Sequence, residues 1–219
     1  MTLTLPPLKR NYPGNDRFQL ETPELLIGGS GYVCIIGANG SGKSSFGEAL
    51  AAHSQLQTGH NWYYLPQYLE RFLFAENIVE QLGDLLSQKV DKSKLTSLLT
   101  ELGFLDPGAV FDFPFLLMSG GERRRMALAC VFYMQPDYLI MDEPDIGVTP
   151  KENMVLLSKI HNLQAINTGV IVISHSSDIV NESSELICLK AGKIQRMGKT
   201  RDLLADPEFE LKEYGVRFQ

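Results

Sequence analysis

A glycine-rich run near residue 40 combines the residue types and the spacing that hold a polyphosphate. It reads Gly37-Ala38-Asn39-Gly40-Ser41-Gly42-Lys43-Ser44, with Ser45 next, and fits the pattern of a glycine, four free positions and Gly-Lys-Ser. Glycines let the backbone turn tightly and bring its N–H groups close to an anion, and the helix that follows adds partial positive charge. We expect Lys43 to reach the β- and γ-phosphates and the Ser44 hydroxyl to bind Mg²⁺. The run therefore predicts a site for a nucleotide such as ATP.

Two adjacent carboxylates follow a second candidate strand. Residues 138–141 are apolar and lead directly into Asp142 and Glu143. A strand that ends this way places both acids at the carboxyl edge of the sheet, where open α/β folds bind ligands. Asp142 would hold Mg²⁺ through water, and Glu143 would polarise the water that attacks the γ-phosphate. Two adjacent acids after a strand are, by themselves, also typical of a solvated turn. Their occurrence together with the glycine-rich run favours a role in binding Mg²⁺ and in hydrolysis.

A third motif, Ser119-Gly120-Gly121-Glu122, opens a predicted helix. Ser119 and Glu122 fit a capping box, with serine at the N-cap and glutamate three residues later. The capping box leaves the two glycines unexplained, since each costs about 1 kcal/mol relative to alanine inside a helix. Glycines here fit a helix start that lies flush against a second phosphate group.

The rest of the chain supplies the elements that must position these groups. Apolar runs predict strands at 32–36, 62–65, 138–141, 170–173 and 186–189, with helices from Ser45 onward, near 120–134 and near 150–166. Leucine-rich stripes give a helical pattern from Glu76 to Gly103, and we expect these stripes to be core. Apolar strands that alternate with helices indicate a largely parallel sheet covered on both faces.

Composition narrows the functional classes. The chain has 219 residues and a net charge of −6, which argues against a bare nucleic-acid binder. The cationic run at 123–125 lies in a predicted helix, where a solvated face or local contacts are the default reading. Cys34, Cys130 and Cys188 sit in separate apolar stretches and are expected to be buried free thiols. No apolar run is long enough to cross a bilayer, so we expect a soluble chain whose membrane role, if any, comes through a partner.

The order of the motifs resembles the nucleotide-binding domain of ABC ATPases over nearly the whole chain. The glycine-rich run is followed by Gln67, Ser-Gly-Gly-Glu, Asp142-Glu143-Pro144 and Ile173-Ser174-His175. The resemblance implies an α/β fold of the P-loop NTPase, ABC type: a mixed or parallel sheet core with an antiparallel β subdomain and a small helical subdomain. It also implies one domain over 1–219. The core and β subdomain would occupy 1–67 and 116–219, and the helical lobe about 68–115, running into the signature helix at 119–134.

The same resemblance assigns roles to residues that the spacing alone does not. It implies a head-to-tail dimer in which each ATP lies between one subunit's glycine-rich run and the other's signature motif, Ser119 to Glu122. Gln67 would contact Mg²⁺ and sense a transmembrane partner, and His175 would contact the γ-phosphate. Tyr12 would stack on the adenine, although a tyrosine beside a turn is also a common structural residue.

Several segments look most similar to ATPase subunits of energy-coupling factor transporters, which power uptake of vitamins and transition-metal ions. These segments are Tyr12-Pro13-Gly14, Glu76 to Glu80, and Phe113-Pro114-Phe115 ahead of the signature motif. The resemblance implies a cytoplasmic subunit bound to the membrane face through transmembrane partners, with a second ATPase subunit and no nucleic acid. Aromatic residues at 68–74 would either seat a membrane-protein helix or pack beneath the helical lobe.

One position departs from the family pattern. Thr149 stands where the family has an aspartate that crosses the dimer interface. With Pro150 and Glu152 it still forms a capping box with proline at N1, so the helix start survives while the carboxylate is lost. This departure leaves two other readings open: a regulatory subunit that binds ATP and pairs with a more active ATPase, or a non-transport ABC ATPase.

Overall fold

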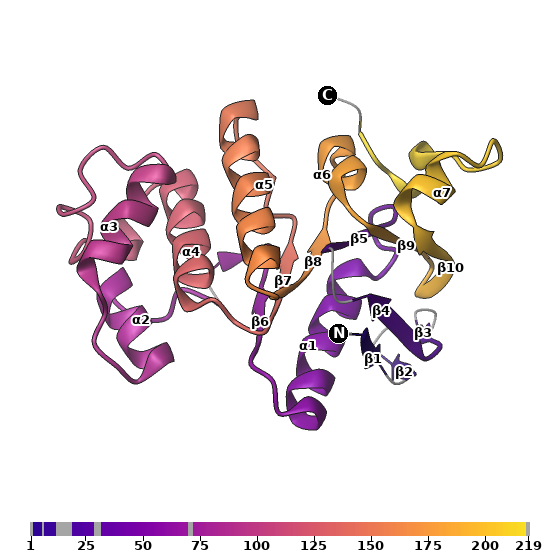
Figure 1. The fold of residues 1–219 in the computed structure, drawn as a ribbon, viewed down its shortest axis with the longest axis horizontal. Coiled ribbons are helices and arrows are strands. Elements are labelled where there is room, and N and C mark those ends of the chain that lie inside the picture. Colours follow the sequence, from indigo (N-terminus) through magenta and orange to yellow (C-terminus); the bar gives the residue numbers. More distant parts are fainter. Residues whose placement is uncertain (1, 6, 12–18, 29–31, 70–71, 218–219) are drawn as a thin grey trace.

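The protein is described by a computed structural model, which defines residues 2–5, 7–11, 19–28, 32–69 and 72–217 (Figure 1). Its centre is an eight-stranded sheet in the order β2-β3-β10-β9-β5-β8-β7-β6. The strands are β2 (Leu8–Asn11), β3 (Gln19–Thr22), β5 (Tyr32–Ile36), β6 (Trp62–Leu65), β7 (Tyr138–Asp142), β8 (Gly169–Ile173), β9 (Glu185–Lys190) and β10 (Lys193–Lys199). A separate antiparallel pair joins β1 (Thr2–Leu5) to β4 (Leu25–Gly28).

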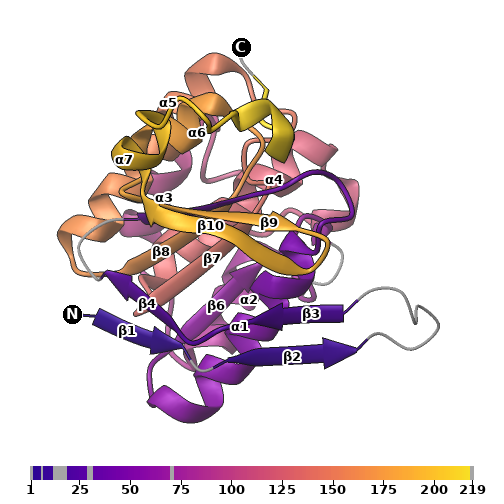
Figure 2. The same ribbon diagram turned by 90° about the vertical axis from the view of Figure 1, so that its right-hand side faces the viewer.

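The five strands from β9 to β6 run parallel, and β5 lies between β9 and β8. Cys34 pairs with Leu186 on one side and with Val172 on the other, so the strand that leads into the glycine-rich run is central. All five residues of β5 are buried, as expected of a strand covered on both faces. The sheet becomes antiparallel at β10 against β9 and at β2 against β3, the side that faces the viewer in Figure 2. The expected mixed sheet with an antiparallel part is confirmed.

Helices cover both faces of this sheet. They are α1 (Lys43–Thr58), α2 (Ile78–Leu86), α3 (Lys92–Glu101), α4 (Gly120–Met134), α5 (Pro150–Ala165), α6 (Ser177–Glu182) and α7 (Thr200–Leu204), with short 3-10 turns at Phe115–Leu117 and Leu211–Tyr214. Side chains alternate along β5: Val33 and Ile35 pack with Phe46 of α1, whereas Cys34 and Ile36 belong to the larger core that includes α4 and α5. Because successive side chains of a strand point to opposite faces of the sheet, those of β5 pack into two different cores.

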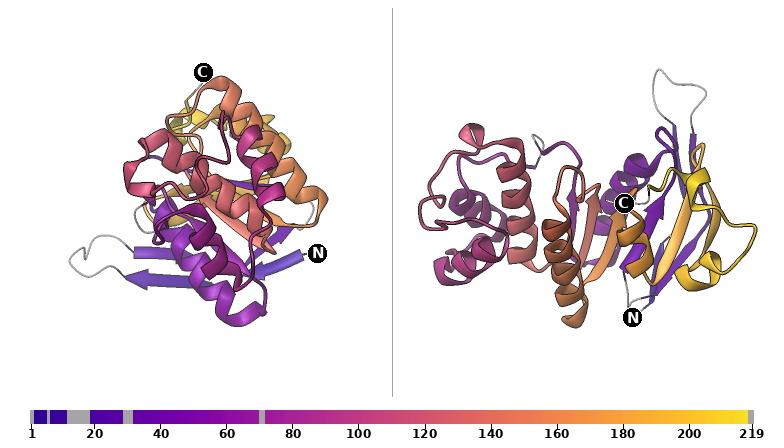
Figure 3. Two further views of the ribbon diagram at one scale, coloured as in Figure 1. Left: turned by 90° about the vertical axis from the view of Figure 1, so that its left-hand side faces the viewer. Right: turned by 90° about the horizontal axis from the view of Figure 1, so that it is seen from above.

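Helices α2, α3 and α4 gather at the end of the molecule opposite β1 to β4 (Figures 1 and 3). The helical pattern predicted over 76–103 divides into two helices, because Ser87 adopts a left-handed conformation (φ 52°) and Asp91 caps a new start. Gly103 follows α3 with φ 86°, which confirms it as the stop. Leu95 and Leu99 are fully buried, so the leucine stripes are core as predicted. The division of the chain into lobes at residues 67 and 116 remains a prediction.

Two further expectations from composition can be compared with the structure. The three cysteines are buried free thiols, as predicted. Within the residues that the structure describes, none of the helices combines the length and apolar character that crossing a bilayer requires.

Candidate active site

A cavity of about 880 Å³ opens at the carboxyl ends of β5, β7 and β8. Its walls come from the glycine-rich run, from Gln67 and Tyr68 after β6, from the segments that follow β7 and β8, and from Arg217 near the end of the described chain. Parallel strands bring their carboxyl ends to one sheet edge, so motifs more than 130 residues apart in sequence meet here. The sequence predicted a nucleotide site at this edge of the sheet.

The glycine-rich run has the tight backbone path that its composition predicts. Gly40 and Gly42 adopt positive φ angles of 77° and 101°, which side-chain-bearing residues rarely reach. At Gly37 the requirement is steric instead, since an added Cβ would lie 2.5 Å from the carbonyl oxygen of Leu189. Gly42 also precedes the first residue of α1 and offers no side chain to cap it. The loop and the start of α1 line the cavity, and a glycine-rich loop that leads into a helix is the arrangement by which anion-binding loops offer backbone N–H groups.

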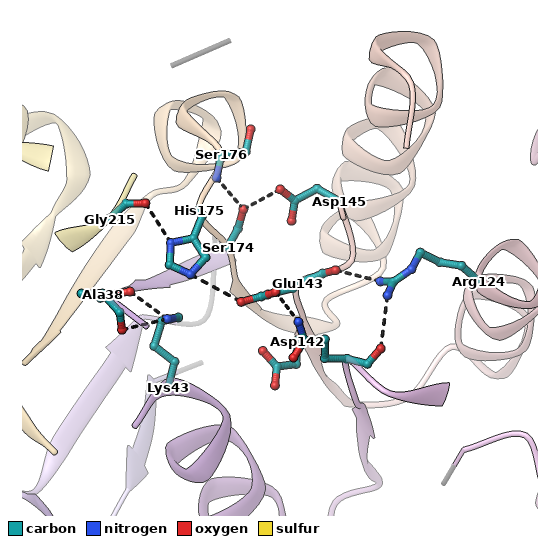
Figure 4. A network of polar contacts seen from close by, with 12 residues as sticks. Ala38, Lys43, Arg124, Asp142, Glu143, Asp145, Ser174, His175, Ser176 and Gly215 are labelled. Atoms are coloured by element: carbon teal, nitrogen blue, oxygen red, sulfur yellow. Dashed lines mark hydrogen bonds and ion pairs between the residues drawn. The ribbon is translucent and has the colours of Figure 1, made fainter. Parts of the chain in front are cut away.

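Lys43 places its ammonium group beside the loop rather than in solvent. Only 6% of the residue is exposed, and Nζ donates to the carbonyl oxygens of Gly37 (2.7 Å) and Ala38 (3.3 Å; Figure 4). Burial lowers the pKa of this group, while the carboxylates of Glu143 and Asp142 act in the opposite direction. The result is a positioned cation facing two acids.

The groups predicted to hold Mg²⁺ fit a magnesium site. Asp142 is buried; one carboxylate oxygen accepts from the Tyr64 hydroxyl at 2.9 Å, and the other, Oδ1, has no hydrogen-bond partner among the described residues. A buried carboxylate oxygen left this way is costly unless it meets a cation or water. Ser44 and Gln67 line the cavity, and so does Glu143, which directly follows the buried Asp142. Oxygen donors that are few and partly open suit Mg²⁺, which keeps waters and takes other ligands from substrate phosphates.

The Glu143 side chain contacts two other residues that were predicted to be catalytic. Its carboxylate accepts from Gln67 Nε2 at 2.7 Å and lies 3.4 Å from His175 Nε2. The side chains of Glu143 and His175 are only 12% and 13% exposed. Glu143 has a left-handed backbone (φ 51°), unusual outside glycine, while its N–H donates to the Ile173 carbonyl of the neighbouring strand. The three residues predicted to be catalytic therefore converge in one cavity.

Two supporting residues were not singled out by the sequence. Arg124 donates to the carbonyl oxygens of Glu143 (2.7 Å) and Gln67 (3.2 Å), and so ties helix α4 to both. Asp145 accepts from the Ser174 hydroxyl at 2.9 Å, and burial raises the pKa of its carboxyl group. A solvated face or local contacts were expected for the cationic run, but Arg124 instead bonds to two residues distant in sequence, and no local pattern identifies it as a partner of the site.

The signature motif lies outside this cavity. Ser119 and Glu122 form the predicted capping box: the Glu122 N–H donates to Ser119 Oγ, and the Ser119 N–H donates to Glu122 Oε2 at 2.9 Å. Gly120 and Gly121 are exposed; an added Cβ would face open space at Gly120 and make ordinary contact with an arginine at Gly121. Contacts within the described chain therefore do not require glycine at either position.

Thr149 forms the second predicted capping box at the start of α5. Its hydroxyl accepts from the Glu152 N–H, its own N–H donates to Glu152 Oε2 at 2.7 Å, and Pro150 occupies N1. Glu152 Oε1 also accepts from Arg125 of α4 at 3.1 Å. Threonine at this position thus supports the helix locally while placing no carboxylate there.

The structure describes most of the remaining residues that were predicted to bind the nucleotide. Asn39 and Ser45 line the cavity, and Ser41 is buried. Tyr12, the predicted adenine-stacking residue, lies outside the described residues.

The family model that matches this sequence is that of ABC transporters, over residues 24–145, more than half of the chain. The protein belongs to the ABC transporter family and is an ABC ATPase. Among curated relatives, the energy-coupling factor transporter ATP-binding protein EcfA3 of Oenococcus oeni is 26% identical, covering 90% of this chain and 80% of its own. EcfA2 of Latilactobacillus sakei subsp. sakei is 29% identical, with coverages of 95% and 82%.

Solved structures agree on the fold. The structure of cbiO1 from Clostridium perfringens, part of the ABC transporter complex cbiONQ, gives a TM-score of 0.68 at 20% identity, covering 94% of this chain and 91% of that one. The ATP-binding cassette MJ0796, solved as a dimer bound to ADP and Pi, gives 0.74 at 16% identity, with coverages of 92% and 99%. The predicted ABC-type α/β fold is confirmed.

Proposed function

We propose that the chain is the ATP-hydrolysing subunit of an importer of the energy-coupling factor type and works as a head-to-tail dimer. The observation that carries this proposal is the position of Glu143 between Gln67 and His175, in the cavity that the glycine-rich run lines. An acid held by an amide and an imidazole beside a phosphate-binding loop is suited to hydrolysis of a triphosphate.

Each residue has a physical role in this reaction. Lys43 and the loop N–H groups bind the phosphates and offset the charge that develops on them. Ser44, Asp142 and Gln67 would hold Mg²⁺, which neutralises phosphate charge when bound. Glu143 Oε1 or Oε2 accepts a proton from the attacking water, and Gln67 restricts the carboxylate to one orientation. His175, which also lines the cavity, orients the γ-phosphate.

A second subunit would complete the site. Ser119, Gly120 and Gly121 are exposed at the start of a 15-residue helix and stay outside the subunit's own cavity. Such a helix start can bind the γ-phosphate of a nucleotide held by the other subunit. The open space beside Gly120 leaves room for that contact, which supports the head-to-tail arrangement.

Membrane partners would dock near Gln67. Tyr68 and Phe74 are exposed at 71% and 61%, whereas Phe72 between them is buried. The aromatic segment thus has both characters foreseen from the sequence: one ring in the core and two available to a partner. On this proposal the chain lies at the cytoplasmic face, held by transmembrane subunits that carry a vitamin or a metal ion.

Isothermal titration of MgATP into the purified chain tests the binding step directly. We expect saturable heat with one site per chain, together with ATP turnover whose specific rate rises with enzyme concentration as dimers form. A well-folded protein that gives no heat with MgATP would contradict the proposal.

Thr149 supports a second candidate, a regulatory subunit that pairs with a more active ATPase. Replacing Thr149 with aspartate is expected to leave stability unchanged, because aspartate is also a good N-cap. The added carboxylate should strengthen ATP-dependent self-association by at least about tenfold, as one charge-assisted contact is worth about 1.5–3 kcal/mol. Thr149→Ala is the matched control: it should lose about 1 kcal/mol of stability and gain no self-association. Sedimentation with MgATP measures both; equal association of Thr149→Asp and wild type would count against a missing contact at this position.

A further inference from the structure

The segment Gly215, Val216 and Arg217, named here the C-terminal strap, is fixed firmly to the core. The preceding 3-10 turn buries Leu211 and Tyr214, and Val216 is also buried. The ring of Tyr214 stacks on Phe209 with centroids 5.6 Å apart, and the Val216 N–H donates to the Leu211 carbonyl. Buried apolar groups on both sides of Gly215 therefore set where the strap lies.

The strap runs beside the residues that follow β8. The Arg217 N–H donates to the His175 carbonyl at 2.7 Å, and the Ser177 N–H donates to the Arg217 carbonyl at 3.0 Å. Together these bonds make a parallel bridge between Ser176 and Arg217. The backbone on either side of His175 is thus held by a segment 40 residues further along the chain.

The imidazole of His175 is held as well. Its Nδ1 lies 2.9 Å from the Gly215 carbonyl oxygen (Figure 4). Because a carbonyl only accepts, Nδ1 must carry the hydrogen of this bond, and Nε2 is the nitrogen turned toward Glu143. A Cβ on Gly215 would lie 3.3 Å from Nδ1 and 3.2 Å from the Cα of Ala38, at a φ of 75°. Glycine therefore lets the strap fit between the glycine-rich run and the histidine.

Arg217 adds charge to the same place. It is exposed and lines the cavity beside His175 and Ser176. Among the described cavity-lining side chains, Lys43 and Arg217 are the two that carry a permanent positive charge. Lys43 lies on the side of the glycine-rich run, and Arg217 lies on the side of His175.

We propose that the C-terminal strap is a working part of the phosphate site. The Gly215 carbonyl positions the His175 imidazole, and the Arg217 guanidinium contacts the terminal phosphate of a bound nucleoside triphosphate. Guanidinium groups suit phosphate oxygens because their N–H donors are planar and paired. This inference rests on the proposed function, since it needs a triphosphate in the cavity.

The arginine is tested by comparing Arg217→Ala, Arg217→Lys and the control Arg201→Ala. Arg201 is an exposed arginine of α7 that pairs with Asp202 and does not line the cavity. Arg217→Ala should weaken MgATP binding about tenfold and MgADP binding much less, with partial recovery in Arg217→Lys and no change in Arg201→Ala. If wild type and Arg217→Ala bind MgATP equally well, the role of the arginine is refuted and the proposed function still stands. Wild type that binds no MgATP would overturn the proposed function too.

The positioning role of Gly215 is tested by a double-mutant cycle with His175. Gly215→Ala should lower kcat about tenfold with little change in KM, because the nucleotide still binds but the imidazole shifts. In a His175→Ala background the same change should have no further effect on kcat, since its route of action is gone. An equal loss of kcat in both backgrounds, or none in either, would refute positioning through His175. Circular dichroism of each variant establishes that the compared proteins are folded.

Discussion

Replacing Glu143 with glutamine is expected to lower ATP turnover by at least about 100-fold, the scale of a lost general base, while MgATP still binds. Glutamine keeps the size of the side chain and can still contact Gln67, but it cannot take a proton from water. The backbone contacts of Glu143 with Ile173 and Arg124 do not depend on the carboxylate. Binding and hydrolysis should therefore separate, and ATP-bound dimers should accumulate.

Phosphate release under saturating MgATP measures this effect, and sizing columns run with ATP report the dimer. Glu208→Gln is the matched control, since it makes the same change in charge at an exposed position outside the cavity. Turnover of Glu143→Gln at the wild-type rate would show that another group activates the water.

Replacing Lys43 with alanine is expected to weaken MgATP binding about 100-fold, the loss of a charge-assisted contact of up to about 3 kcal/mol. Lys43 is buried beside the loop, where water screens its charge poorly, so its attraction for phosphate is larger than that of a surface lysine. Removing it also takes away one positive charge that acts on Asp142 and Glu143, so these carboxylates then repel the phosphates more strongly. Binding, rather than the chemical step, should suffer first.

Fluorescent-nucleotide titration and calorimetry measure this loss. Lys89→Ala serves as the control because Lys89 is exposed in the turn between α2 and α3. A urea melt is needed alongside, since the change also deprives the Gly37 and Ala38 carbonyls of a donor. A folded Lys43→Ala protein with wild-type affinity for MgATP would remove this lysine from the site.

Local signals were enough to predict the elements that carry the motifs. The strands at 32–36 and 62–65 and the helix at 120–134 end where the sequence placed them, because apolar runs, a capping box and glycine punctuation act over a few residues. The two carboxylates could be placed for the same reason, because they follow an apolar run. Strand β7 includes the buried Asp142 as its last residue, and Glu143 comes directly after it.

Contacts between distant segments could not be predicted in this way. Strand β10 mixes polar residues with a bulge near Arg196 and lacks a clear period, and α6 has only six residues. Arg124 sits in a run of three arginines, and nothing in the run distinguishes the one that reaches Glu143. Gly215 lies 40 residues from His175, and the hydrogen bond between them depends on how a short turn packs, which periodicity does not report.

The ion pair between Arg125 and Glu152 links two helix starts within one subunit. Arg125 belongs to α4, which begins with the capping box of Ser119 and Glu122. Glu152 forms the capping box with Thr149 at the start of α5. The Arg125 guanidinium also lies 5.1 Å from the centroid of the Phe104 ring, so it has contacts on two sides. If α4 rotates as a rigid body, it must either drag the beginning of α5 with it or break this pair.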